Sequence, residues 1–295
     1  MNSRHILNLA LVIAVCMLII FSIYGPGSKT PDIRPVVTTL DLATINTIQV
    51  WHRDTLTLKF VRNNNTWQLE KPFSYPASNF QVASLLAIAQ EKSHSTIDPD
   101  NHDLKKFGLD KPVYRLVLDE KTIEIGNTEP LNFRRYVLYD NKIHLIDDSR
   151  YRFLSQEAVK FANKKIIPAG QTISSIQAAN FTLSREADDS DWKLSPDNST
   201  VSADEKNRLV DDWLNLQAID IRSWDKHDEP SNQTVTLGFT DNTSLQLWLL
   251  QLENKFYLVR RDAGLKFEIS DSSWKALFAL NFAENKPQTG NLEQK

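Results

Sequence analysis

The feature that most constrains the fold of this chain is an internal repeat. Residues 45–49 (INTIQ) return as residues 173–177 (ISSIQ), and residues 65–69 (NTWQL) return as residues 190–194 (SDWKL). The offset between matching positions stays between about 121 and 128 residues along the chain of 295 residues. Because self-similarity at a fixed period is typical of repeated structural units, we expect two copies of one small domain.

Each copy has the same predicted order of elements, β-β-β-α-β-β-β-β-α. Short β-branched runs separated by turn residues predict the strands, and the connections are too short for parallel crossovers. We therefore expect an α+β fold in which each copy is an antiparallel sheet with a packed helix. The predicted strands are residues 44–50, 55–61, 67–69, 114–118, 122–125, 135–139 and 142–146 in the first copy, and 234–239, 244–250, 256–260 and 265–269 after the helix of the second copy.

The main helix of each copy is predicted from a serine followed three residues later by Gln or Glu, which is a capping-box pattern. A final helix in each copy is expected to start at an aspartate N-cap. The first copy is predicted to occupy residues 41–167 and the second copy residues 168–281. The capping residues are Ser78 with Gln81, Ser202 with Glu205, and, for the final helices, Asp148 and Asp271.

An apolar run ahead of the repeats predicts a transmembrane helix at residues 6–24. At 1.5 Å per residue the run is about 28 Å long, close to the thickness of a bilayer core. A basic residue before it favours a cytoplasmic N-terminus at residues 1–5, and residues 25–40 are expected to form a linker. A cleavable signal peptide is the alternative. The polar residues 282–295 are predicted to be a disordered tail.

Charge is distributed unevenly between the two copies. Through residue 171 there are 21 Lys and Arg against 17 Asp and Glu, and beyond it there are 13 against 20. The basic half is the one next to the predicted membrane span, where anionic headgroups would attract it, although drift of surface charge between two copies explains the same difference. With a pI near 6.1 and no basic stripe, nucleic-acid binding is not expected.

The chain offers few residues for catalysis or metal binding. Residues 98–103 alternate carboxylates as a calcium loop does, but they lack the glycine and the final acid of an EF-hand. Residues 225–229 place a histidine among acids in a hydrophilic run. Both segments are interpreted as exposed loops. We therefore predict no catalytic residue, no metal and no cofactor, and we do not expect an enzyme.

A possible interaction surface is predicted around the tyrosine that recurs in the two copies. Tyr136 corresponds to Tyr257, and two adjacent arginines precede the first of them, Arg134 and Arg135. Such residues are enriched where proteins bind one another. The alternative is that one arginine faces solvent and the other lies at a sheet edge.

The chain resembles a bacterial family of unknown function, the DUF4340 domain. The resemblance extends over most of residues 44–280, and its motifs are structural. It implies a membrane-anchored extracytoplasmic protein, in some bacteria encoded beside ABC-type transporters, and it supplies no catalytic residue. The motifs are Trp67-Gln-Leu69, Pro72, Phe107-Gly108-Leu109-Asp-Lys-Pro112, Ile125-Gly126 and Tyr136-Val137.

These observations predict a single-pass protein of the inner membrane whose two domains face the periplasm. The expected function is an interaction or scaffold module, accessory to an ABC-type transporter or another envelope complex. The alternative is a receptor that binds a small molecule or glycan between the two copies, since duplicated domains often hold ligands at their interface.

Overall fold

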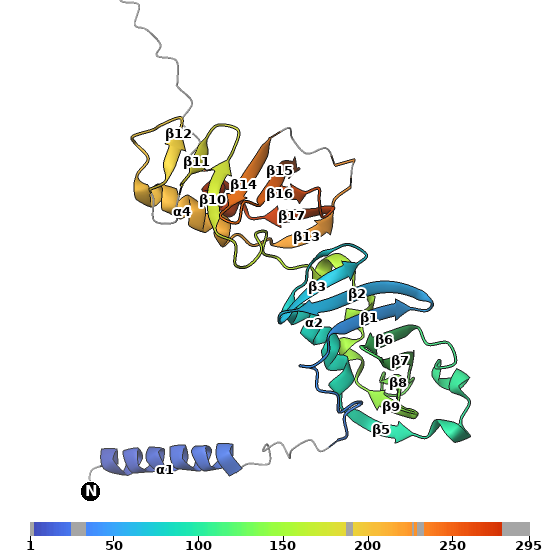
Figure 1. Ribbon diagram of the computed structural model, residues 1–295. Coiled ribbons are helices and arrows are strands. Elements are labelled where there is room, and N and C mark those ends of the chain that lie inside the picture. Colours follow the sequence, from blue (N-terminus) through green and yellow to red (C-terminus); the bar gives the residue numbers. More distant parts are fainter. Residues whose placement is uncertain (1–2, 25–33, 187–190, 226, 229–232, 279–295) are drawn as a thin grey trace, which may run out of the picture.

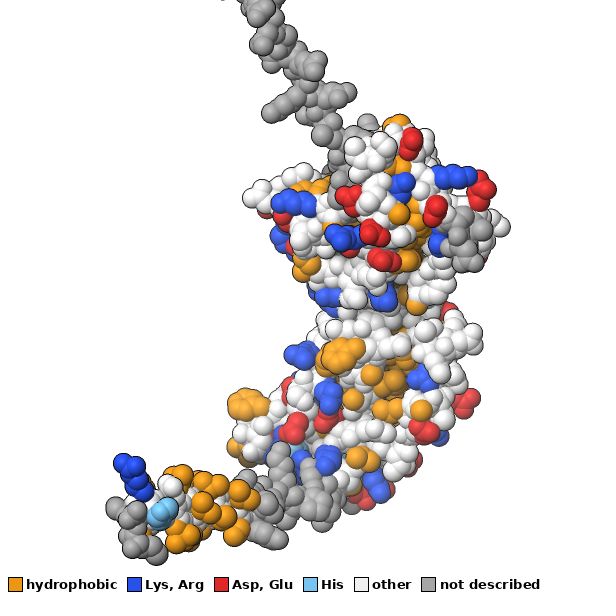
Figure 2. Space-filling view, turned by 90° about the vertical axis from the view of Figure 1, so that its left-hand side faces the viewer, with side chains coloured by type: hydrophobic (Ala, Val, Ile, Leu, Met, Phe, Trp, Pro, Cys, Tyr) orange, Lys and Arg blue, Asp and Glu red, His pale blue; other side chains and the backbone are white. Residues whose placement is uncertain are grey.

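The computed structural model shows an N-terminal helix followed by two lobes (Figure 1). Helix α1 (Ser3–Tyr24) is long and apolar enough to cross a membrane, and its side chains form an almost continuous hydrophobic surface in Figure 2. The first lobe comprises residues 34–157, the connector residues 158–172 and the second lobe residues 173–278. The structure describes residues 3–24, 34–186, 191–225, 227–228 and 233–278.

The first lobe is built on a nine-stranded antiparallel sheet with the order β4-β3-β2-β1-β6-β7-β8-β9-β5. Its neighbours in the sheet are mostly neighbours in the chain, as expected for short hairpins. The strands are β1 (Thr47–His52), β2 (Thr55–Asn63), β3 (Thr66–Lys71), β4 (Tyr75–Pro76), β5 (Ser93–Ile97), β6 (Tyr114–Leu118), β7 (Lys121–Thr128), β8 (Arg135–Tyr139) and β9 (Lys142–Ile146).

The second lobe has an eight-stranded antiparallel sheet with the order β12-β11-β10-β14-β15-β16-β17-β13. Apart from the additional β4 of the first sheet, the two orders are the same, so the predicted α+β class with two antiparallel sheets is confirmed. The strands are β10 (Ile173–Gln177), β11 (Thr182–Ser184), β12 (Lys193–Ser195), β13 (Asp220–Ser223), β14 (Thr234–Phe239), β15 (Ser244–Leu252), β16 (Lys255–Arg260) and β17 (Leu265–Ile269).

Helices cover one face of each sheet because alternate strand residues are apolar. In β14, for example, Val235, Leu237 and Phe239 are buried while the residues between them are partly exposed. Such a face must be covered by another apolar element. After α1, and not all on this face, the helices among the described residues are α2 (Asn79–Leu86), η1 (Ala87–Gln90), η2 (Pro99–Asn101), η3 (Leu104–Phe107), η4 (Asp148–Arg150), α3 (Arg152–Ser155), η5 (Ala158–Phe161), α4 (Ala203–Leu214) and α5 (Asp271–Leu277).

The helix start agrees fully with the prediction at α4 and differs from it at α2, η4 and α5. At α4, Ser202 and Glu205 form the complete capping box. At α2 the Ser78 hydroxyl accepts from the Gln81 backbone amide, but the side-chain oxygen Oε1 of Gln81 is buried without a hydrogen-bond partner. The N-cap of α5 is Ser270 rather than Asp271. Asp148 begins the short 3-10 helix η4 instead of capping a long final helix.

The predicted linker is shorter than expected because its last residues join the first lobe. Val36 forms a β-bridge with Lys92, and the Ser93 amide donates to the carbonyl oxygen of Pro35 over 2.7 Å. Val37 is buried. Residues 1–2 and 25–33, and the predicted tail 282–295, lie outside the described residues.

The second face of the first sheet is partly covered by a segment that contains the Phe107-Gly108-Leu109 motif. Phe107 packs against Tyr136 with ring centroids 4.9 Å apart, and Gly108 ends η3 with a φ of 67°. Gly126 lies where β7 loses its regular register, directly beneath this segment. A Cβ atom on Gly126 would stand 2.3 Å from the carbonyl oxygen of Phe107, so the motif and Gly126 depend on each other.

We predict that Gly126→Ala lowers the free energy of unfolding by about 2 kcal/mol, because the Phe107 backbone must move away from the sheet. Urea unfolding measures this change. The control is Gly170→Ala, where an added Cβ meets no atom within 4 Å and only the positive φ of 85° opposes it. We expect the control to cost about 1 kcal/mol. Equal losses in the two variants would contradict the close packing of Phe107 on Gly126.

Candidate functional site

The two lobes meet at a junction built around Tyr75, which comes from the edge strand β4 of the first sheet. Tyr75 is only 3% exposed, and it belongs to the apolar core of the second lobe. Its ring lies 5.7 Å from the ring of Phe267 in β17, and the guanidinium of Arg260 lies 5.3 Å from its centroid. Burial raises the pKa of Tyr75, although nearby Arg260 opposes this shift. One aromatic ring thus ties the first sheet to the second core.

The connector contributes to both cores. Phe161 packs in the first core, whereas Val159, Ile166 and Ile167 pack in the second. Backbone bridges continue the same pattern, because Ala162 pairs with Ala77 of the first lobe and Lys165 pairs with Gln217 of the second. The predicted boundary between residues 167 and 168 therefore falls inside a segment that both lobes share.

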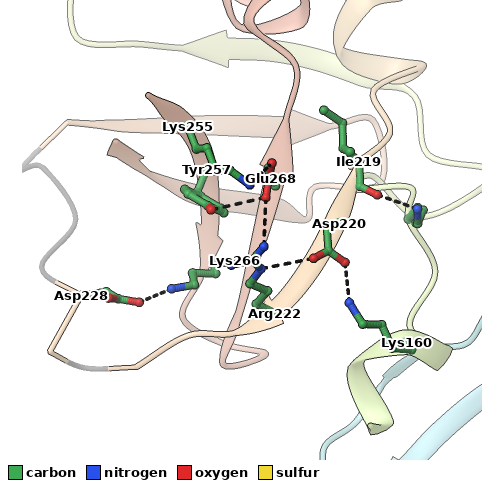
Figure 3. A network of polar contacts seen from close by, with 10 residues as sticks. Lys160, Ile219, Asp220, Arg222, Asp228, Lys255, Tyr257, Lys266 and Glu268 are labelled. Atoms are coloured by element: carbon green, nitrogen blue, oxygen red, sulfur yellow. Dashed lines mark hydrogen bonds and ion pairs between the residues drawn. The ribbon is translucent and has the colours of Figure 1, made fainter. Parts of the chain in front are cut away.

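A polar network reinforces the junction on the second sheet (Figure 3). The Lys160 ammonium, from the connector helix η5, lies 2.7 Å from a carboxylate oxygen of Asp220 in β13. Arg222 then bridges Asp220 and Glu268, and Glu268 accepts from Lys255 over 2.8 Å. Partial burial favours a raised pKa for Asp220, but hydrogen bonds from Lys160 and Arg222 outweigh it and hold the pKa below its usual value.

A cleft of about 380 Å³ opens beside Tyr75 at this junction. Its size is within the range of small-molecule sites. Two cations, Lys165 and Arg260, lie in its lining, and Arg260 also pairs with Asp262 at 3.2 Å. Its described lining contains no carboxylate, and it consists of Thr66, Trp67, Gln68, Tyr75, Pro76, Ala77, Ser78, Asn79, Asn163, Lys165, Ile166, Ile167, Pro168, Ala169 and Arg260.

The four residues of the predicted interaction surface do not lie together. Arg135 and Tyr136 belong to β8 of the first sheet and Arg134 directly precedes it, whereas Tyr257 belongs to β16 of the second. Tyr257 is buried, and its hydroxyl lies 3.4 Å from Glu268. The two tyrosines therefore occupy equivalent strands of the two sheets, but they do not share one surface.

Arg135 is largely buried and supports the fold. It makes a two-pronged ion pair with Asp148 at 2.6 and 2.8 Å, and its Nη1 donates to the carbonyl oxygen of Gly126. Its guanidinium also lies 3.7 Å from the ring centroid of Tyr151. These contacts use most of its donors, so of the predicted pair Arg134 is the more exposed arginine.

The two acidic segments serve as turns in the described residues. Asp98 and Asp103 accept backbone amides at the starts of η2 and η3. Asp225 accepts from the His227 amide, and Asp228 pairs with Lys266. The described part of the chain has no group of three His, Cys, Asp or Glu side chains placed to hold a metal ion.

The sequence pointed to neither Tyr75 nor Arg260, the two side chains that meet at the junction. Both belong to segments predicted as parts of separate copies, and only the packing of the lobes brings them together. The nearby motif Trp67-Gln-Leu69 was the available signal, since Trp67 lines the same cleft.

The helix α1 and the two joined sheets define a two-lobed α+β protein with a single candidate span among its described residues. The model of the domain of unknown function DUF4340 matches residues 67–236, more than half of the chain, so this chain belongs to the DUF4340 family. The match starts in β3 and ends in β14, and therefore includes Tyr75 and the connector but not Arg260 and Phe267. No curated protein and no solved structure matches the chain.

We predict that Tyr75→Ala destabilises the second lobe although Tyr75 belongs to the first sheet. Loss of the buried ring should lower the free energy of unfolding by about 3 kcal/mol. Hydrogen exchange followed by mass spectrometry should show faster exchange in β17, where Phe267 loses its partner. Tyr75→Phe is the matched control, because it keeps the ring and removes only the hydroxyl, which contacts the Lys165 carbonyl at 3.4 Å and interacts with Arg260. Unchanged exchange in β17 of Tyr75→Ala would contradict the packed junction.

Proposed function

We propose that this protein is a membrane-anchored interaction module whose two lobes face the periplasm and bind an envelope partner, such as an ABC-type transporter. The observation that carries the proposal is the packed junction. Because Tyr75 and the connector join the two cores, surfaces on both lobes keep a fixed relation and can contact one partner together. Helix α1 would hold this body at the inner membrane.

Exposed apolar side chains on the lobes give such a partner a place to bind. Outside α1, the described residues with large exposed hydrophobic side chains are Phe80, Leu131, Phe133 and Ile219. Phe80 is 76% exposed on α2, a helix whose other face packs on the first sheet. An exposed aromatic side chain on a folded helix is typical of residues that contribute strongly to protein–protein binding.

A small-molecule receptor is the second candidate, and the junction cleft favours it. Arg260 is already paired with Asp262, so Lys165 is the cation of the described lining that an anionic ligand would meet.

We predict that a photoreactive phenylalanine analogue at Phe80 in the full-length protein captures one integral membrane protein in native cells. Mass spectrometry of the adduct identifies it. The control carries the same analogue at Lys142, an exposed position at the start of β9, and should not yield that adduct. Identical adducts from both positions, or only adducts of the protein with itself, would contradict partner binding through the α2 face.

A further inference from the structure

The loop between β7 and β8 holds two large apolar side chains in solvent, and we call residues 129–134 the apolar tip. Leu131 is 84% exposed and Phe133 is 74% exposed. Their exposed fractions are among the highest of the large hydrophobic side chains in the described residues. Exposed apolar residues that lie together on a folded loop mark a contact surface.

The apolar tip is a built loop, because a buried carboxylate organises its backbone. Glu129 is 8% exposed, and its two oxygens accept from the amides of Leu131 at 2.9 Å and Asn132 at 2.8 Å. The Phe133 amide donates to the Glu129 carbonyl oxygen, and Phe133 has a φ of 55°. These backbone hydrogen bonds lower the pKa of Glu129, so the loop keeps its shape at neutral pH.

The Glu129 carboxylate is directed at the backbone of its own loop, and its charge interacts with Arg134. Arg134 directly follows Phe133 and is half-buried. At the base of the loop, Arg135 holds Gly126 and Asp148 in place. The result is an apolar pair next to a cation, which matches a bilayer interface with anionic headgroups.

The register of the first sheet places the apolar tip close to the point where the chain arrives from α1. Pro35 is bonded to Ser93, Ser93 pairs with Ile146, and Ile146 pairs with Arg135, the residue that directly follows the apolar tip. Three such steps amount to roughly 15 Å, at about 5 Å between paired strands.

The distance from the membrane span to this edge of the sheet is limited by the chain itself. Helix α1 ends at Tyr24, and the described first lobe starts at Arg34. Ten residue steps reach at most about 35 Å when fully extended. The connection therefore keeps this edge of the sheet within reach of the bilayer surface when α1 spans the membrane.

From this geometry we infer that Leu131 and Phe133 insert into the bilayer interface on the side where the lobes lie, with Arg134 at the headgroups. The inserted loop would be a second attachment beside α1 and would fix the orientation of the first lobe on the membrane. This inference rests on the anchored arrangement in the proposed function. It requires only lipid, so it can be tested where no protein partner is present.

The test uses the full-length protein in vesicles of phosphatidylethanolamine and phosphatidylglycerol. Cys16→Ser removes the cysteine of the chain, and Asn132→Cys adds a spin label at the apolar tip. We expect the label to be accessible to oxygen and shielded from a water-soluble nickel complex. The control label at Lys142, beyond the opposite end of β8, should show the reverse. Equal accessibility of the two labels to the nickel complex would overturn the inference.

A second measurement avoids any label in the loop. In vesicles that contain a photoactivatable lipid, the peptide with residues 129–134 should form lipid adducts, and the double variant L131S/F133S should lose them. The midpoint of thermal unfolding should stay unchanged in this variant, since both side chains are exposed. Adducts that persist in the double variant would overturn the inference, while capture of a partner at Phe80 would be unaffected.

Discussion

The burial of Tyr75 in the core of the neighbouring lobe is the interaction on which the arrangement of this protein depends. Each lobe alone is a curved antiparallel sheet with one face covered by helices, and nothing in that design requires the lobes to meet. Tyr75 changes this, because its ring leaves the edge of the first sheet and fills space beside Phe267. Removing it would leave a cavity in the core of the second lobe, against which Phe73 of the first lobe also packs.

The connector makes the same link in the backbone. Its residues alternate between the two cores, and its bridges pair with Ala77 on one side and Gln217 on the other. The ion pair between Lys160 and Asp220 contributes little to the free energy of unfolding, because both side chains are partly exposed and water screens the attraction. Apolar packing therefore sets the junction, and the Lys160–Asp220 pair in Figure 3 adds a polar contact between the connector and the second sheet.

Much of the fold could be predicted from the sequence, because the alternation of apolar and polar residues in a strand shows which of its faces is buried. The strands β14 to β17 were predicted almost to the residue for this reason. The edge strands β5 and β13 were missed, since runs such as Ser93–Ile97 are polar and are held by pairing with β9. Helix α4 has a complete capping box and α2 has only half of one, so a sequence motif can be present without the hydrogen bonds that define it.

The candidate sites were harder to predict, because exposure depends on partners that are distant in the chain. A sequence does not show that Arg135 donates its hydrogen bonds to Asp148 and Gly126. Nor does it show that the Glu129 carboxylate binds the backbone of its own loop while Leu131 and Phe133 stay exposed. The junction cleft has the same origin, since Arg260 and Tyr75 are 185 positions apart. Only the packing of folded elements brings such residues together.

The most direct test of a single two-lobed body is an electron-paramagnetic distance measurement between spin labels at Lys142 in the first lobe and Ser244 in the second, in the full-length protein with Cys16→Ser. Both positions are exposed at the start of a strand, β9 and β15. A packed junction predicts one narrow distribution of distances. A broad distribution would show that the lobes move independently and would contradict the account.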